Sequence, residues 1–175
     1  MPDKAGSDKA SGRLGGTPAT LLLQREGISF RLHEFEHDPG DRHYGAAAAA
    51  ALGADPDQVF KTLLANVEGL PSPGIAVGIV PVSGQLSLKE LARAVGGKAA
   101  TMCDPVVAQR VTGYVVGGIS PFGQKRLLPT AIDETCELYD TIFVSGGKRG
   151  FDIEIAPADL VAVLHAVVAP IGTTR

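Results

Sequence analysis

The sequence has few cysteines and no long apolar run. Its two cysteines, Cys103 and Cys136, are too few and too far apart for a metal motif or for the disulfide framework of a secreted domain. No segment approaches the roughly 18 consecutive apolar residues of a membrane helix. Residues 1–16 also lack the apolar centre of a signal peptide. We therefore expect a cytoplasmic protein without a membrane segment, in which both cysteines are structural.

Positive charge is not in excess either, because the formal net charge is -3 at pH 7. This excludes a surface coated with bases for bulk binding of DNA, although it leaves room for a small basic patch. A chain of 175 residues with 45% hydrophobic residues is long enough for one core and too short for two full domains. We expect one domain over residues 17–171 and a disordered, glycine-rich and charged tail over residues 1–16.

Common catalytic motifs are also missing. Residues 145–150, SGGKRG, lack the spacing and the final Ser or Thr of a phosphate-binding loop, and no G-x-S-x-G turn precedes a helix. His33 and His37 have the spacing of a zinc pair, but only a helix would place them on one face, and their segment is predicted to be a strand followed by a turn. We expect neither a metal site nor a nucleophile supplied by the protein.

Capping residues and apolar periodicity predict alternating helices and strands. The predicted helices begin at Thr17, Ala46, Asp55, Ser87, Asp104 and Ala156, and the last one closes the chain. The predicted strands cover residues 28–35, the end of 59–69, 74–82, 114–116, 127–133, 141–144 and 151–155. The strand at 74–82 is apolar throughout, which predicts burial on both faces.

Two glycine-rich segments, 117–129 and 145–150, carry paired bases. If the last four predicted strands form an antiparallel meander, these two connections emerge at the same end of the sheet. One rim would then hold Lys125, Arg126, Lys148 and Arg149 together with Gly117, Gly118, Gly146 and Gly147. Such a rim suits a phosphate-bearing ligand, because glycines expose backbone amides and bases attract anions. The alternative is a pair of tight turns with solvated bases.

Lys61 is unusual because it lies within an apolar stretch, VFKTLLANV. A buried cation is costly unless it is paired or used for binding. The alternative is that Lys61 lies on an exposed face and extends its ammonium group into water.

Several segments resemble the YbaK-type Cys-tRNA(Pro) deacylases of the YbaK/EbsC family. They are EHDP (36–39), PDQVFKTLL (56–64), PVSGQL (81–86), DPVVAQRVTGYVVGGISPFGQKRLLPT (104–130) and VSGGKRGFDIEIAPADL (144–160). The resemblance runs in order from about Thr17 to Ile171. It implies a single α/β domain with a mixed, largely antiparallel sheet and flanking helices. It also implies an enzyme that removes cysteine from proline tRNA without a metal or organic cofactor.

The same resemblance implies roles for individual residues. Lys61 would bind the terminal adenosine of the tRNA or its phosphate, and Gly117 would place its backbone near the aminoacyl ester. The other implied substrate-binding residues are Thr62, Gly118, Ser145, Gly146, Gly147 and Asp152. Phe35 and Tyr44 are implied substrate-binding residues as well. Both depart from the family pattern, since Phe35 replaces a tyrosine and Tyr44 replaces a phenylalanine.

In this family the substrate's own thiol attacks the ester, so the resemblance implies that no protein nucleophile is needed. The expected partner is aminoacyl-tRNA, with Cys-tRNA(Cys) as a further candidate substrate and prolyl-tRNA synthetase as a candidate protein partner. Two alternatives remain open. One is a module that binds a nucleotide, a tRNA end or a synthetase without catalysis, and the other is an Ala-tRNA(Pro) deacylase of the wider family.

Overall fold

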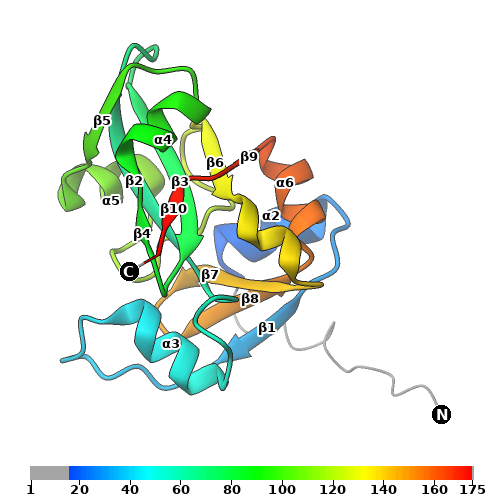
Figure 1. Ribbon diagram of the computed structural model, residues 1–175. Coiled ribbons are helices and arrows are strands. Elements are labelled where there is room, and N and C mark those ends of the chain that lie inside the picture. Colours follow the sequence, from blue (N-terminus) through cyan, green and yellow to red (C-terminus); the bar gives the residue numbers. More distant parts are fainter. Residues whose placement is uncertain (1–15, 175) are drawn as a thin grey trace.

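The computed structural model describes residues 16–174, so the predicted tail falls, except for Gly16, outside the described residues. Two β-sheets form the centre of the molecule and helices flank them (Figure 1). The larger sheet has the strand order β5-β2-β3-β6-β9 and the smaller has the order β1-β8-β7. Five of the seven strand pairs are antiparallel, which confirms the predicted mixed, largely antiparallel α/β domain.

The larger sheet is built around a long hairpin. Strand β2 (Phe60–Glu68) pairs antiparallel with β3 (Ile75–Pro81) and with β5 (Ala99–Met102). Strand β3 then pairs in parallel with β6 (Thr130–Asp133), and β6 with β9 (Val167–Ala169). Every residue of β3 is buried, as its apolar sequence predicts.

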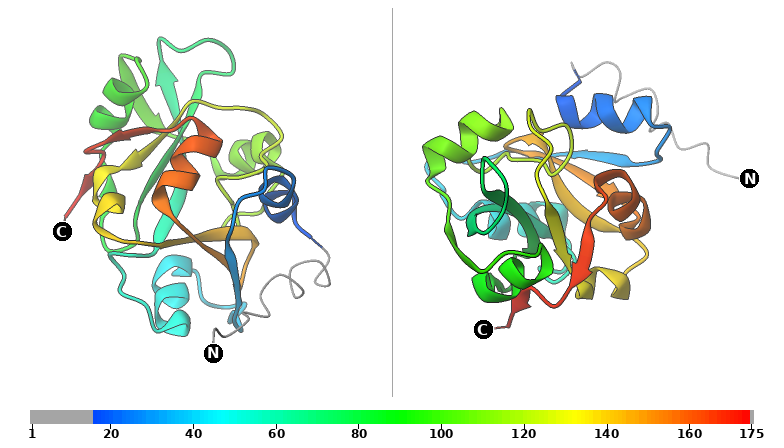
Figure 2. Two further views of the ribbon diagram at one scale, coloured as in Figure 1. Left: turned by 90° about the vertical axis from the view of Figure 1, so that its right-hand side faces the viewer. Right: turned by 90° about the horizontal axis from the view of Figure 1, so that it is seen from above.

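The smaller sheet is antiparallel throughout. It consists of β1 (Arg31–Glu34), β7 (Ile142–Lys148) and β8 (Phe151–Ile155). A separate short pair joins β4 (Gln85–Leu86) to β10 (Gly172–Thr173). Strands β7 and β8 cross the molecule between the larger sheet and helix α3 (Figure 1, Figure 2). The smaller sheet therefore packs against one end of the larger sheet.

Helix boundaries follow the capping residues. Side chains of Thr17, Ser87 and Asp104 cap α2 (Pro18–Arg25), α4 (Leu88–Ala94) and α5 (Pro105–Thr112), as predicted. The alanine-rich helix α3 (Tyr44–Leu52) ends at Gly53 in the left-handed conformation. Helix α6 (Pro157–Leu164) and a 3-10 turn (Glu134–Leu138) complete the set. No described helix is long and apolar enough to cross a membrane.

Three predicted elements are wrong. Asp55 begins a single turn, in which Gln58 N donates to Asp55 O at 2.8 Å, because the residues that follow pair with β3 and leave no room for a helix. Residues 114–116 form a turn and no strand. The closing helix stops at Leu164, and strands β9 and β10 follow it.

The predicted four-stranded meander is also wrong. Strand β6 pairs with β3 in the larger sheet, so only β7 and β8 remain as a hairpin in the smaller one. Parallel pairing joins segments that are distant in the sequence, and local patterns do not reveal it.

The core lies on both faces of the larger sheet. One cluster includes Leu64, Ile79 and Phe122 and extends to β8 and α6. The opposite cluster packs Val80 against Leu91 of α4. A third, smaller cluster lies under α3 and contains Ala48, Val59, Phe143 and the half-buried Phe35.

The glycines of the β7–β8 hairpin pack against this core. A Cβ atom on Gly146 would lie 2.6 Å from the Phe151 ring, and one on Gly147 would lie 2.9 Å from the Tyr114 ring. The Thr17 hydroxyl donates to Gly146 O and also caps α2 by accepting from Thr20 N. These glycines therefore let helix α2 and Tyr114 approach the bulged strand β7.

We predict that Thr17→Val destabilises the fold. The substitution keeps the side-chain shape but removes both the helix cap and the donor to Gly146 O, so the free energy of unfolding should fall by about 1–3 kcal/mol. Urea denaturation measures this change. Thr17→Ser retains the hydroxyl and should retain most of the stability, and equal stability of the valine variant and the wild type would contradict the prediction.

Candidate functional site

A cavity of about 1040 Å³ lies where α3, the first half of β2, the start of α5 and the 116–119 turn come together with β7 and β8. Most of its wall is apolar, and α3 and β2 contribute more lining residues than any other element. The polar side chains of its wall are those of Arg42, His43, Tyr44, Lys61, Thr62, Ser83, Ser145 and Asp152. A concave apolar wall with a few convergent polar groups is typical of a small-molecule or substrate site.

The alanines of α3 keep this cavity open. Ala46, Ala49, Ala50 and Gly53 follow helical spacing and all line the wall. Helix α3 also lies close to the turn after β3, since a Cβ atom on Gly45 would lie 2.6 Å from Val82 Cγ1. The alanine run therefore serves two purposes, because it forms a stable helix and presents small side chains to the cavity.

Strand β2 contributes Lys61 and Thr62. Lys61 Nζ donates to Gly84 O at 2.8 Å, in the turn that follows β3, so the ammonium group is held at the end of the hairpin. Thr62 Oγ1 is buried and has no hydrogen-bond partner among the described residues. A buried hydroxyl without a partner is costly in free energy, and a ligand in the cavity would supply the missing hydrogen bond.

Gly117 closes the cavity beside Tyr44. Its φ is +86°, and a Cβ atom there would lie 2.7 Å from the Tyr44 ring. Arg149 lies 4.8 Å above the same ring, and its Nε donates to Val116 O at 2.9 Å. Only glycine combines this backbone conformation with such a close approach to an aromatic ring.

The two glycine-rich segments, 117–129 and 145–150, are in direct contact with each other. A Cβ atom on Gly118 would lie 2.8 Å from Lys148 Cα, so the backbones of the two turns touch. Lys148 lies 4.7 Å above the Phe151 ring. Lys125 lies against Gly113, at the end of α5. The structure thus brings Gly117, Gly118, Lys148 and Arg149 together without the meander that predicted their proximity.

Asp152 is a nearly buried carboxyl group in the cavity wall. It is 7% exposed, and burial raises its pKa to about 7. Its neighbours across the smaller sheet are His33 on β1 and Ser145 on β7. Ser145 Oγ accepts from Gly147 N at 3.2 Å and also lines the cavity. The site therefore contains an acid that changes its charge near neutral pH.

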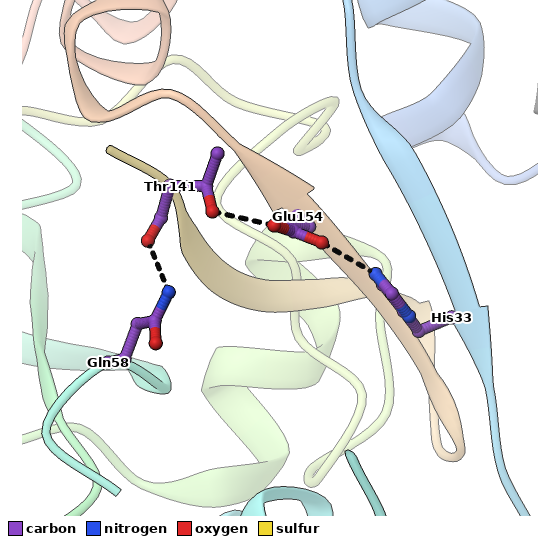
Figure 3. Close-up of polar contacts among 4 residues, drawn as sticks. All are labelled: His33, Gln58, Thr141 and Glu154. Atoms are coloured by element: carbon purple, nitrogen blue, oxygen red, sulfur yellow. Dashed lines mark hydrogen bonds and ion pairs between the residues drawn. The ribbon is translucent and has the colours of Figure 1, made fainter. Parts of the chain in front are cut away.

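A chain of polar contacts links His33, Glu154, Thr141 and Gln58 (Figure 3), and Glu154 lies two residues after Asp152 on β8. Glu154 pairs with His33 Nε2 at 2.9 Å and accepts from Thr141 Oγ1 at 2.6 Å. Partial burial raises the pKa of Glu154, but the bonds from Thr141 and His33 outweigh it and hold the pKa below its usual value. Gln58 Nε2 donates to Thr141 O at 2.7 Å, which ties the smaller sheet to the turn before β2.

Six of the ten residues proposed from the sequence line the cavity: Tyr44, Lys61, Thr62, Gly117, Ser145 and Asp152. The other four do not. Phe35 packs under α3, Gly118 lies against Lys148, and Gly146 and Gly147 pack against the core. Within residues 16–174, no three His, Cys, Asp or Glu side chains converge as metal ligands.

Sequence patterns missed other residues of the wall. Arg42 and His43 line the cavity from the turn before α3, and Met102 and Cys103 line it from the end of β5. Burial raises the pKa of the Cys103 thiol. The run of six alanines at residues 46–51 is the one signal that indicates a wall of small side chains.

We predict that Asp152→Asn stabilises the protein in a pH-dependent way. The folded pKa of about 7 exceeds the ordinary 3.8, so the folded state loses stability as pH rises between these values. Above about pH 7 the ionised, buried carboxylate carries its full penalty, and its removal should raise the free energy of unfolding by up to roughly 4 kcal/mol. At about pH 5 the gain should be less than half as large. Thermal or urea unfolding at both pH values measures the difference, and a gain that is independent of pH would contradict the prediction.

Comparisons with known proteins identify the family of the chain. Residues 41–163 match the family model of the aminoacyl-tRNA editing domain. The chain is 34% identical over 157 residues to the Cys-tRNA(Pro)/Cys-tRNA(Cys) deacylase EbsC of Enterococcus faecalis, covering 90% of this chain and 93% of that protein. It is 26% identical over 158 residues to the multifunctional Ser/Thr-tRNA deacylase ProXp-y of Escherichia coli, covering 90% and 92%.

A solved structure supports the same relationship. A protein described as a trans-editing enzyme for prolyl tRNA synthetase superposes with a TM-score of 0.76 at 25% identity, over 89% of this chain and 95% of its own. The family model covers most of the folded part, and the relatives extend the match to nearly the whole chain. The chain therefore belongs to the aminoacyl-tRNA editing domain family, as the sequence resemblance predicts.

Proposed function

We propose that the protein hydrolyses Cys-tRNA(Pro), and so removes cysteine that has been attached wrongly to proline tRNA. The observation that carries this proposal is the convergence of Lys61, Thr62, Gly117, Ser145 and Asp152 on one cavity in an editing-domain fold. The EbsC relative, named for Cys-tRNA(Pro) and Cys-tRNA(Cys) deacylation, supports the choice of amino acid. Such a substrate implies that the protein acts in the cytoplasm, where aminoacyl-tRNA is used.

The cavity suits the 3′ end of an aminoacyl-tRNA. Its volume of about 1040 Å³ is large enough for a terminal nucleoside together with its amino acid. Arg42 and Lys61 supply positive charge for a phosphate group, and the alanine face of α3 offers an apolar surface for the flat adenine ring. We assign Lys61 to the terminal adenosine or its phosphate.

The proposed chemistry uses the thiol of the substrate. The cysteine sulfur attacks the carbonyl carbon of its own ester, a C–S bond forms, and the bond from carbon to the ribose oxygen breaks. The ribose oxygen takes up the proton that the thiol has lost, and water then opens the four-membered thiolactone to release cysteine. The protein contributes positioning and stabilises the negative charge on the carbonyl oxygen. Gly117 lines the cavity without a side chain, so its backbone amide is the candidate donor.

The protonation state of Cys103 supports the proposal that the nucleophile is the thiol of the substrate and not a thiol of the protein. Cys103 lines the cavity, but burial raises its pKa, and the neutral thiol is a poor nucleophile. Ser145 has no hydrogen-bonded histidine among the described residues that would activate its hydroxyl.

Selection of proline tRNA would need a second protein. The bases in or beside the cavity are few, and the formal net charge of the chain is -3. Arg42 and Lys61 line the wall, and Arg149 stacks on Tyr44. This surface is too small to read a whole tRNA. We propose that a synthetase, with prolyl-tRNA synthetase as the first candidate, presents the charged tRNA.

Two alternative functions can be distinguished from Cys-tRNA(Pro) hydrolysis by what the protein does to different substrates. An Ala-tRNA(Pro) deacylase would release alanine, which lacks a thiol, and would need a different mechanism. A binding module would retain tRNA ends without ester cleavage. The ProXp-y relative, named for Ser/Thr-tRNA deacylation, makes seryl and threonyl esters necessary controls.

We predict that Lys61→Ala lowers kcat/KM for Cys-tRNA(Pro) by roughly 100-fold, because the terminal nucleotide loses its cationic contact. Loss of the ester is followed with radiolabelled cysteine, in parallel with Ala-tRNA(Pro). Wild-type protein should release cysteine and leave alanine attached. Lys89→Ala, a matched change at an exposed site on α4, should leave activity unchanged. Full activity of Lys61→Ala would refute the assignment, and rapid alanine release would favour the alternative deacylase.

We predict that Gly117→Ala lowers deacylation by about 10-fold or more, because the new Cβ atom overlaps the Tyr44 ring and displaces the turn at the ester. The matched control is Gly27→Ala. Gly27 has a similar φ of +69°, but its Cβ position has no neighbour within 4 Å, so this variant carries the backbone strain without the overlap. Equal activities of the two variants would show that close packing at Gly117 is unimportant.

A further inference from the structure

Asp152 is the one carboxylate in the described wall of the cavity. The other charged or ionisable groups of that wall include Arg42, His43 and Lys61, which carry or can acquire positive charge. No described side chain donates a hydrogen bond to Asp152, although the residue is only 7% exposed. A buried carboxylate without a partner is strongly unfavourable, so its presence in a binding cavity indicates a ligand.

Neighbouring residues on the smaller sheet do not satisfy this carboxylate. His33 lies directly opposite Asp152 on β1, but its Nε2 is paired with Glu154. Ser145 lies opposite on β7, and its oxygen accepts a bond from Gly147 N. The T-shaped contact between His33 and Phe143, with ring centroids 5.3 Å apart, holds the imidazole on the side of Glu154. The carboxyl group of Asp152 is therefore free to bind a group that enters the cavity.

We propose that Asp152 binds the α-ammonium group of the aminoacyl ester. This inference rests on the proposed function and assigns a further specificity-determining contact within it. The end of an aminoacyl-tRNA has anionic phosphates and a single cationic group, the α-ammonium. The cavity has the complementary pattern, with cations at Arg42 and Lys61 and a single carboxylate at Asp152. A charged donor is the partner that best offsets burial of a carboxylate.

This role of Asp152 would let the site distinguish esters with a free α-amino group from esters with an acylated one. An aminoacyl ester with a free α-amino group would be bound, whereas a peptidyl or N-acylated ester would lose the ion pair and leave Asp152 buried without a partner. Discrimination of this kind is strong, because an unpaired buried charge costs more than a missing apolar contact.

Protonation of Asp152 then controls binding. Below about pH 7 the carboxyl group of the free protein is protonated, so formation of the ion pair must displace that proton and the affinity falls. Above about pH 8 the α-amino group of the ligand loses its own proton. Affinity should therefore be greatest between these values, and binding at slightly acidic pH should release a proton from Asp152. The other charged or titratable groups of the cavity wall are Arg42, His43, Tyr44, Lys61 and Cys103. The strands of the smaller sheet add Arg31, His33, Glu34, Lys148 and Glu154.

Two stable analogues test the proposal by calorimetry. The first is 3′-amino-3′-deoxyadenosine that carries cysteine through an amide bond, and the second carries 3-mercaptopropionate and lacks only the amino group. Wild-type protein should bind the first roughly 10- to 100-fold more tightly at about pH 7.5, since a desolvated ion pair has been removed from the second. Titrations of the first analogue in two buffers of different ionisation enthalpy should report proton release at about pH 6.5.

Two variants test whether Asp152 is the carboxylate that binds the amino group. Asp152→Asn should bind the two analogues equally, close to the affinity of wild-type protein for the second. Asp140→Asn makes the same chemical change at an exposed residue and should preserve the preference of the wild type. Equal affinities of wild-type protein for the two analogues would overturn the proposal, and that comparison needs no variant. A preference that survives in Asp152→Asn would overturn it as well.

Failure of the inference and failure of the proposed function give different results. If wild-type protein cleaves Cys-tRNA(Pro) but binds both analogues equally, the enzyme assignment stands and the role of Asp152 is wrong. If wild-type protein neither cleaves the ester nor binds either analogue, both are wrong.

Discussion

The fold depends on a seam where the turn before β2 meets the start of β7. Val59 forms a single parallel bridge with Phe143, and Phe143 N donates to Gln58 O at 3.1 Å. Val82 N donates to Val59 O at 2.8 Å, so the same short segment also holds the turn after β3. The seam fixes the smaller sheet beneath the larger one (Figure 2). The cavity lies on the side of this seam that α3 covers. The bond from Gln58 to Thr141 O reinforces the seam, and the charge-assisted bond from Thr141 to Glu154 holds Thr141 in place.

Several groups in the cavity are poorly satisfied by the protein alone. Thr62 has a buried hydroxyl without a described partner, and Asp152 is a buried acid whose pKa is raised to about 7. Gly117 holds a left-handed backbone against an aromatic ring. The rest of the molecule compensates with well-packed clusters on both faces of the larger sheet. Such unfavourable groups are concentrated at functional sites because a ligand supplies the hydrogen-bond or charge partner that the protein does not.

Local chemistry made part of the structure predictable. Thr17, Ser87 and Asp104 cap helices where the sequence places them, because capping depends on residues within one turn. The Asp55 turn resembles a helix start over the same distance, and only pairing of the following residues with β3 distinguishes the two. The parallel partner of β6 is about 50 residues away, and no short pattern identifies it. For the site, the family resemblance predicted Tyr44, Lys61, Gly117 and Asp152, which all line one cavity, whereas the contribution of the alanines of α3 required three-dimensional structure. The roles of these residues stay predictions.

The most direct test of the account is a crystal structure with the cysteinyl amide of 3′-amino-3′-deoxyadenosine. The central claim is that the cavity between α3, β2 and β8 holds the aminoacyl end of a tRNA. We expect the adenine against the alanine face of α3, the amide carbonyl near the Gly117 backbone and the amino group at Asp152. The analogue bound elsewhere, with the cavity occupied only by water, would contradict the claim.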